Sequence, residues 1–204
     1  MNKLIKKEIL EQKIKELRPW AHQIIFPYGL VADTPPYTGE VRKYEPYPKF
    51  VRINETGVFD DFLPPDKILD LGCSTGFFSI HFAQLGFNVT AIDNFEKNIE
   101  QISFVKEVYE LNNLNIIQAD IKDINLIFKD YNLILLLGVI HHLKENDVRL
   151  NLLKRCYDGL KKNGIIIIET KPQIPCFELL QKSGFVPIKL KAKKSRDVWK
   201  GTKV

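Results

Sequence analysis

The sequence has few cysteines and no long hydrophobic run, and each absence excludes a class of protein. Its three cysteines, Cys73, Cys156 and Cys176, form an odd and widely spaced set, which gives neither a disulfide framework nor a CxxC metal site. The longest apolar runs, such as residues 133–140, are far shorter than the roughly 20 residues of a membrane-spanning helix. The first seven residues carry three lysines and lack the apolar stretch of a secretory signal. We therefore expect a cytoplasmic protein with reduced thiols and no membrane segment.

The sequence also lacks acids and histidines at metal-ligand spacing, so no metal site is expected. Its 204 residues, 45% hydrophobic and 27% charged, have the size and composition of an ordinary folded domain. The net charge of +5 is uneven, because residues 189–203 hold seven basic residues and a single acid, Asp197. The basic residues are Lys189, Lys191, Lys193, Lys194, Arg196, Lys200 and Lys203. This stretch either attracts phosphate groups or forms a solvated edge hairpin whose lysines discourage aggregation.

The start of the chain predicts a helix followed by a covering segment. Leu10, Ile14 and Leu17 lie at helical spacing, so residues 2–17 are predicted to form an amphipathic helix that ends before the first proline. The cap segment, residues 19–50, holds six of the eleven prolines and seven aromatic residues. It is too rich in proline for a long helix and too aromatic for a disordered linker. We expect it to pack over the rest of the chain.

From residue 61 onward, predicted strands and helices alternate. The expected strands are 68–71, 89–93, 115–119, 131–137, 165–169, 185–191 and 196–202, and the expected helices are 76–85, 96–111, 147–160 and 174–182. Strands separated by helices imply right-handed crossovers and a parallel sheet with helices on both faces. We therefore expect an α/β domain at residues 61–204, preceded by the helix and cap segment at residues 1–60.

The first of these strands ends in a glycine turn, DLGCSTG at residues 70–76, which narrows the choice of ligand. A dinucleotide-binding GxGxxG turn starting at Gly72 would need glycine at positions 74 and 77, which are Ser74 and Phe77. No GK[ST] follows either, so the turn is not a nucleotide P-loop. These two mismatches argue against a nicotinamide dehydrogenase and against a P-loop enzyme.

An acid followed by a GxSxG turn resembles motif I of the class I S-adenosylmethionine-dependent methyltransferases. The resemblance implies a Rossmann-like, seven-stranded methyltransferase sheet, mostly parallel with an antiparallel last strand, and S-adenosylmethionine as the cofactor. It also implies that Asp70 reaches the amino group of the methionine part. The turn residues Gly72, Cys73, Ser74 and Gly76 are then expected to pass under the ribose and methionine of the donor.

Two further strand ends carry acids. Asp93, followed by Asn94, ends the second strand 21 residues after Gly72, and a carboxylate there can accept both ribose hydroxyls of an adenosine. Asp120 and Ile121 follow the third strand and resemble the adenine site of the same family. A single acid at a strand end is often only a helix cap. Acids at three successive strand ends favour an adenosyl ligand.

The fourth strand leads into Gly138 and then into the pair His141 and His142. By the same resemblance, Gly138 borders the methyl group of the donor. Transfer of a methyl group to a hydroxyl needs a base, and imidazole titrates near neutral pH. We expect one of the two histidines to be that base, with His141 favoured because it is nearer the strand end. Alternatively, the pair only caps the following helix or bonds to the backbone.

Three residues of the cap segment are candidates for contact with the substrate. The order of Trp20, His22, Gly29, Thr34, Thr38 and Gly39 resembles the cap of one methyltransferase subgroup. It implies that Trp20, His22 and Tyr28 touch the substrate. Alternatively, Trp20 only anchors the cap segment to the core.

A narrower likeness joins the chain to the bacterial enzymes that carboxymethylate a wobble hydroxyuridine in tRNA. The similar pieces are residues 68–76, 138–142, 164–170 and 196–200. The chain departs from that group because it lacks most of the long N-terminal region and has His141 where those enzymes place a tyrosine. Their carboxylated cofactor is therefore not carried over to this chain.

Three functional hypotheses follow. The first is O-methylation, or N-methylation, of a small or medium polar metabolite, because a short aromatic cap suits an enclosed pocket. The second is modification of tRNA or another RNA, which the basic stretch and the wobble-enzyme likeness favour. The third is a scaffold that binds the cofactor without catalysis. The sequence does not decide the oligomeric state.

Overall fold

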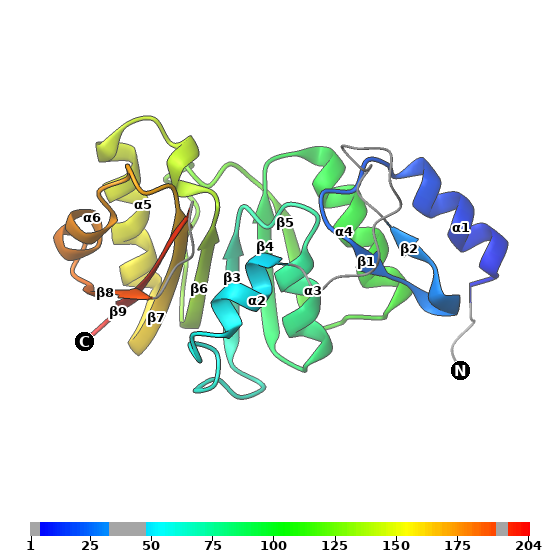
Figure 1. Cartoon of the computed structure of the whole chain (residues 1–204), viewed down its shortest axis with the longest axis horizontal. Helices are drawn as coiled ribbons and strands as arrows, with labels where there is room; N and C mark the ends of the chain where they lie inside the picture. Colours follow the sequence, from blue (N-terminus) through cyan, green and yellow to red (C-terminus); the bar gives the residue numbers. More distant parts are fainter. Residues whose placement is uncertain (1–4, 33–47, 191–195) are drawn as a thin grey trace.

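The computed structural model describes residues 5–32, 48–190 and 196–204. Its main feature is a seven-stranded sheet with the strand order β5-β4-β3-β6-β7-β9-β8 (Figure 1). The strands are β3 (Lys67–Leu71), β4 (Asn88–Asp93), β5 (Leu114–Gln118), β6 (Tyr131–Leu137), β7 (Leu160–Thr170), β8 (Val186–Leu190) and β9 (Asp197–Thr202). The first five pair in parallel, whereas β9 pairs antiparallel with both β7 and β8. This topology confirms the predicted methyltransferase sheet.

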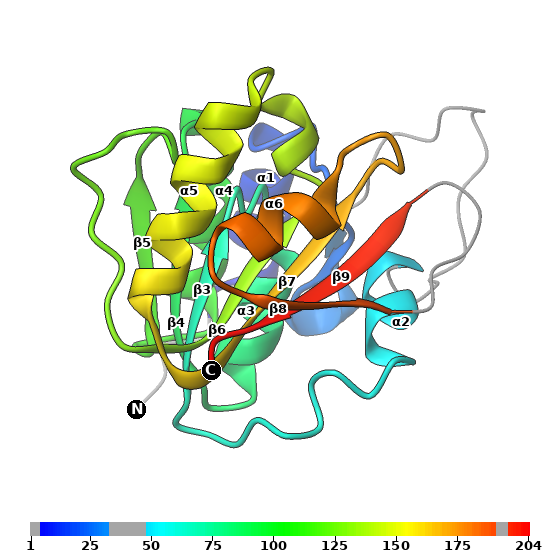
Figure 2. The same cartoon turned by 90° about the vertical axis from the view of Figure 1, so that its left-hand side faces the viewer.

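Helices cover both faces of the sheet, as the alternation predicts (Figure 2). They are α1 (Lys7–Glu16), α2 (Pro48–Asn54), α3 (Phe77–Gln84), α4 (Glu96–Val108), α5 (Asn146–Gly159) and α6 (Cys176–Lys182). Side chains of α1, α3 and α4 share one apolar core with alternate strand residues such as Ile68 and Leu133. Those of α5 and α6 pack in a second core with the intervening residues, such as Leu69 and Ile134. The period-two alternation of the strands therefore divides the interior into two layers.

The N-terminal elements extend the first layer at one end of the sheet. Helix α1 and the short hairpin of β1 (Ile24–Ile25) and β2 (Val31–Ala32) lie beside α4 (Figure 1). The buried Gln101 of α4 fixes them there, because its side-chain amide donates to the carbonyls of Leu17 and Pro19 at 2.6 and 2.7 Å. The predicted N-terminal helix is confirmed. Of the cap segment, residues 33–47, with Thr34, Thr38 and Gly39, lie outside the described residues.

One expected boundary is wrong. The expected helix at 147–160 and strand at 165–169 left residues 161–164 as a turn between them, but β7 begins at Leu160, which pairs with Tyr131. The register shifts before Leu133 pairs with Ile165, and Asn163 takes a positive φ of 63°. The residues expected to form a turn therefore form an irregular start of the strand. The N-terminal helix, expected at residues 2–17, is α1 at Lys7–Glu16, and the remaining predicted strands and helices agree with the structure to within three residues.

Within the described ranges, no helix has the length and apolar character needed to cross a bilayer. The same ranges hold no group of three or more histidine, cysteine or acidic side chains arranged to bind a metal.

Candidate active site

The glycine turn after β3 is a tightly packed loop. The amides of Gly72 and Cys73 both donate to the carbonyl of Ile92 on β4, at 2.8 and 3.0 Å. Gly72 and Gly76 have φ values of 70° and 81°, which favour glycine. A Cβ on Gly76 would lie 2.3 Å from the Cδ1 atom of the buried Ile102. The two glycines therefore bring the loop close to α4 and to the strand ends, as a ligand-cradling turn requires.

Asp70 lies beneath this loop and is almost fully buried. Its Oδ2 atom accepts a hydrogen bond of 2.6 Å from the Ser79 hydroxyl. Burial raises the pKa of Asp70 to about 6, although the Ser79 bond and the charge of Lys49 favour the carboxylate. Burial together with the charges of Asp70 and Asp93 raises the pKa of the Cys73 thiol well above its ordinary value. Asp70 is thus an acid that a cationic ligand group would stabilise in its ionised form.

Asp93, at the end of β4, ties the loop to the next helix. Its Oδ2 atom accepts from the Ser74 amide at 2.8 Å, and its Oδ1 atom accepts from the Phe95 amide and the Asn98 side chain at 2.9 and 3.0 Å. A carboxylate oxygen can accept more than one hydrogen bond. Asp93 can therefore hold the loop in place and still accept bonds from a ligand.

Asp120 and Ile121 follow β5, next to the end of β4, where the Ala119 amide donates to the Asp93 carbonyl at 3.0 Å. The Asp120 carboxylate accepts from the Lys122 amide at 2.9 Å and pairs with the Lys122 ammonium at 3.1 Å. Burial opposes ionisation of Asp120, but these contacts with Lys122 hold its pKa below the usual value. Asp120 is therefore a carboxylate at neutral pH.

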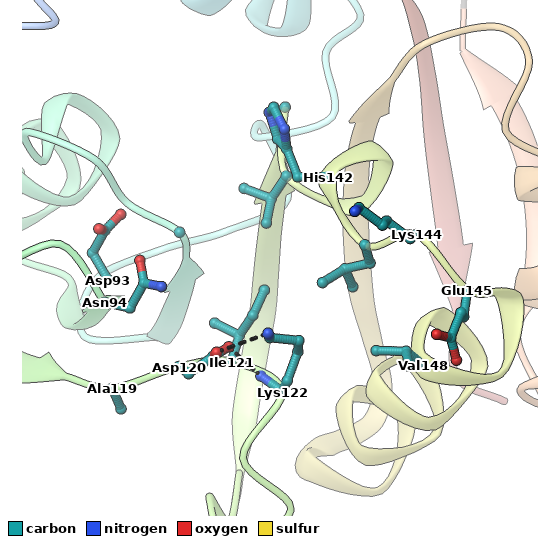
Figure 3. A pocket seen from close by; sticks show the side chains of 14 residues that line it. Asp93, Asn94, Ala119, Asp120, Ile121, Lys122, His142, Lys144, Glu145 and Val148 are labelled. Atoms are coloured by element: carbon teal, nitrogen blue, oxygen red, sulfur yellow. Dashed lines mark hydrogen bonds and ion pairs between the residues drawn. The ribbon is translucent and has the colours of Figure 1, made fainter.

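A cavity of about 790 Å³ opens between these strand ends (Figure 3). Six of the residues predicted to bind the cofactor line it: Gly72, Asp93, Asn94, Asp120, Ile121 and Gly138. Asp70, Cys73, Ser74 and Gly76 belong to the strand end and loop beside it and are not among its lining residues. Its volume is in the range of small-molecule pockets, and its wall combines the carboxylates of Asp93, Asp120 and Glu145 with apolar surface that includes Val139 and Val148. Acids for hydroxyl and amine groups beside an apolar wall fit an adenosyl group.

The two histidines occupy different environments. His142 is exposed and lines the cavity (Figure 3). His141 is partly buried, and the Arg196 Nη1 atom lies 3.0 Å from its Nε2 atom and 3.3 Å from its Nδ1 atom. Burial, followed by the charge of Arg196, lowers the pKa of His141 to about 4. His141 is therefore a neutral imidazole that receives a hydrogen bond from a guanidinium.

The predicted substrate residues do not lie together. The His22 Nδ1 atom is hydrogen-bonded to Thr75 Oγ1 of the glycine turn at 2.8 Å, so His22 reaches the site from the cap segment. Trp20 is buried against Phe26 and donates to the Ile14 carbonyl at 3.0 Å. Tyr28 is about half exposed, and its hydroxyl donates to the Ile5 carbonyl. The structure brings His22 to the glycine turn and places Trp20 and Tyr28 in the N-terminal layer.

The sequence analysis missed a charged cluster beside Gly138. Lys49 and Arg52 of α2 both pair with Glu169, which is buried at the end of β7, and the distance from Lys49 Nζ to Glu169 Oε2 is 3.4 Å. A Cβ on Gly138 would lie only 3.1 Å from Lys49 Nζ. The position of Glu169 at a strand end could have indicated a site residue. Lys49 and Arg52 gave no such signal, because no spacing in the sequence indicates that α2 lies beside the end of β7.

Known proteins resemble both the sequence and the fold. The sequence profile of the family described as "Tellurite resistance protein TehB" matches residues 42–183. A ubiquinone biosynthesis O-methyltransferase of Rickettsia typhi is 36% identical over 105 residues, which are 51% of this chain and 40% of that protein. A carboxy-S-adenosyl-L-methionine synthase of Vibrio atlanticus is 32% identical over 113 residues, which are 53% of this chain and 46% of that protein. The chain thus spans less than half the length of these curated relatives.

Solved structures share the fold at lower sequence identity. The N-terminal domain of EvdMO1, crystallised with S-adenosylhomocysteine bound, has a TM-score of 0.75 at 17% identity, and the likeness covers 98% of both chains. A TehB-like methyltransferase of Corynebacterium glutamicum has a TM-score of 0.61 at 21% identity, over 74% of this chain and 87% of the other. The family match covers more than half of the chain, and the sheet has the predicted order. The chain therefore belongs to the TehB family and, with it, to the class I S-adenosylmethionine-dependent methyltransferases.

Proposed function

We propose that the chain transfers a methyl group from S-adenosylmethionine to an oxygen atom of a small or medium polar metabolite. The observation that carries this proposal is the cavity at the carboxyl ends of β4, β5 and β6, whose wall includes Gly72 of the glycine turn and the strand-end carboxylates of Asp93 and Asp120. Ligands of open α/β sheets bind at this edge, beyond the carboxyl ends of the strands.

The six predicted cofactor residues that line the cavity support the assignment of their roles. Asp93 is the acceptor for the ribose hydroxyls, and Asp120 with Ile121 faces the adenine, because these residues line the same cavity. Asp70, beneath the glycine turn, balances the amino group of the methionine part. The bound cofactor supplies a methyl group on a positively charged sulfur. The chain's contribution is to hold the acceptor oxygen in line with that methyl group, since orientation alone can lower the barrier by several kcal/mol.

Two findings support a metabolite as the acceptor. The cavity is a recess among side chains and has the volume of a small-molecule pocket. The relative from Rickettsia typhi is named for O-methylation in ubiquinone biosynthesis, which is a reaction of a small molecule. His141 and His142 remain the predicted candidates for the proton acceptor, and only His142 lines the cavity.

The acceptor class can be tested with tritiated S-adenosylmethionine. The purified chain is incubated in parallel with the low-mass fraction of a cell extract and with total RNA, and Asp93→Ala serves as the matched control. We expect the label in low-mass compounds for the unaltered chain and much less for the variant. Label only in RNA would establish the RNA-modifying alternative. Micromolar binding of the donor without label in either pool would establish the scaffold alternative.

A further inference from the structure

The amine of Lys49 lies at the end of β6, beside Gly138 of the cavity wall, although Lys49 itself is not one of the residues that line the cavity. Its Nζ atom lies 3.4 Å from the Leu137 carbonyl oxygen and 3.4 Å from Glu169 Oε2. It is also the nearest atom to the place where a Cβ on Gly138 would stand, at 3.1 Å, and Gly138 lines the cavity. Because Gly138 has no side chain, the Lys49 amine lies directly beside the end of β6, where the methyl group of the donor is predicted to lie.

The charges around Lys49 come from several elements. Glu169 of β7 and Asp70 of β3 favour its protonated form, whereas Arg52 of α2 and Arg196 at the start of β9 oppose it. Burial is the main cause of the lowered pKa values of His22 and His141, and the ammonium charge of Lys49 lowers both further. Burial, the largest cause, lowers the pKa of Lys49 to about 8. The amine can therefore gain and lose a proton near neutral pH.

His141 is poorly placed for the same task. If it took up a proton, its ring would become a cation with the Arg196 guanidinium 3.0 Å away. Two cations at that distance repel each other, and the arginine does not lose its proton in proteins. Lys49 differs from His141 because the buried carboxylate of Glu169 pairs with its protonated form.

We propose that Lys49, and not His141, accepts the proton of the acceptor hydroxyl. This inference rests on the proposed function. Methyl transfer forms an oxygen–carbon bond and breaks the carbon–sulfur bond, whose electron pair stays on sulfur. The hydroxyl proton moves to the neutral Lys49 Nζ, and the resulting ammonium pairs with Glu169 until water takes the proton. Charge is balanced, because the cationic sulfur becomes neutral as the amine becomes cationic.

Conservative variants separate a base from a fixed positive charge. Lys49→Arg keeps the positive charge and a partner for Glu169, but its guanidinium cannot give up its proton. Lys49→Met loses the charge and the partner for Glu169. With tritiated donor and the labelled acceptor fraction, we expect both variants to lower kcat by a factor of order 10² or more, with KM changed only a few-fold. His141→Ala should lower kcat far less than Lys49→Arg does, and a loss as large as that of Lys49→Arg would make His141 the proton acceptor instead. Lys154→Arg, at an exposed lysine of α5, is the matched control and should have no effect.

A second readout does not depend on turnover. In chains labelled with ¹³C at the lysine ε-carbon, the Lys49 signal, assigned with Lys49→Arg, should titrate near pH 8, well below the ordinary lysine value of about 10.4. The rate should rise with pH and level off above about pH 8. Near-normal turnover of Lys49→Arg, or titration of Lys49 with the exposed lysines, would overturn the inference alone. Absence of methyl transfer by the unaltered chain would overturn the proposed function and the inference with it.

Discussion

Asp70 is an acid held where ionisation costs free energy. Its folded pKa of about 6 is above the ordinary value of 3.8, so the folded state disfavours the carboxylate. The penalty is fully present above about pH 6 and disappears as the pH falls towards 4. A cationic group of a ligand would offset part of this free-energy cost, so that the unfavourable ionisation of Asp70 would favour the binding of such a ligand.

Replacement of Asp70 by asparagine therefore should stabilise the chain without ligand and weaken donor binding. At pH 8 we expect the free energy of unfolding to rise by up to about 3 kcal/mol, since two pKa units correspond to roughly that amount. At pH 4 the gain should vanish, because Asp70 itself is then mostly protonated. Urea denaturation at the two pH values measures the difference. A variant less stable than the unaltered chain at pH 8 would show that the carboxylate stabilises the fold.

Asp93 holds the glycine turn in place and is also proposed to bind the cofactor. The prediction must separate these two roles. Asp93→Ala should weaken the binding of S-adenosylhomocysteine by about 1–3 kcal/mol through lost charged hydrogen bonds, measured by calorimetry. The variant also leaves the Ser74 and Phe95 amides without their acceptor, so Asp93→Asn, which keeps one acceptor oxygen, is the companion variant. Asp158→Ala, an exposed acid at the end of α5, is the control. Unchanged affinity in Asp93→Ala would remove Asp93 from the cofactor site.

At the scale of elements, the strands and their end residues could be predicted because both depend only on residues that are close together in the sequence. Buried parallel strands are continuous apolar runs, and an acid that follows such a run is placed at the carboxyl edge by the strand itself. Asp93 and Asp120 were located in this way. The start of β7 could not be predicted, since the bulge at Asn163 depends on pairing with Tyr131 across the sheet.

Lys49 and Arg196 could not be found from the sequence for a different reason. Lys49 comes from α2 and Arg196 from the residue before β9, so neither belongs to the strands β3 to β6 or to the turns that follow them. Only tertiary packing brings these two residues to the end of β6. Trp20 is the opposite case, because the sequence suggested a role at the site for a residue that the structure places in the N-terminal layer. An aromatic residue in the cap segment suggested substrate contact, whereas its ring is buried against Phe26 in the N-terminal layer.

The attachment of the N-terminal elements depends on Gln101. Gln101→Leu leaves the buried Leu17 carbonyl and the partly buried Pro19 carbonyl without the Gln101 donor, which should cost about 1–3 kcal/mol. We expect faster hydrogen exchange in residues 5–32 and little change in β3 to β7. Ser103→Ala, an exposed position on the same helix, is the control. Equal exchange in the two variants would mean that the apolar packing of α1 alone holds these elements in place.

At the scale of the whole molecule, the described part of the basic C-terminal stretch is largely engaged in contacts within the chain. Lys189 pairs with Asp197 at 2.9 Å, and Lys203 Nζ donates to the carbonyls of Tyr157 and Leu160 at 2.8 and 2.7 Å. Arg196 faces His141. Lys191, Lys193 and Lys194 lie outside the described residues. The contacts of the described cations agree with a local structural role and give no separate support to RNA binding.

The adenosyl site is tested most directly by a crystal structure of the chain with bound S-adenosylhomocysteine. We expect the ligand in the cavity, with its ribose hydroxyls against Asp93, its adenine against Asp120 and Ile121, and its sulfur beside Gly138. A cavity that stays empty at saturating ligand, or a ligand bound at another place on the chain, would contradict the assignment of this site.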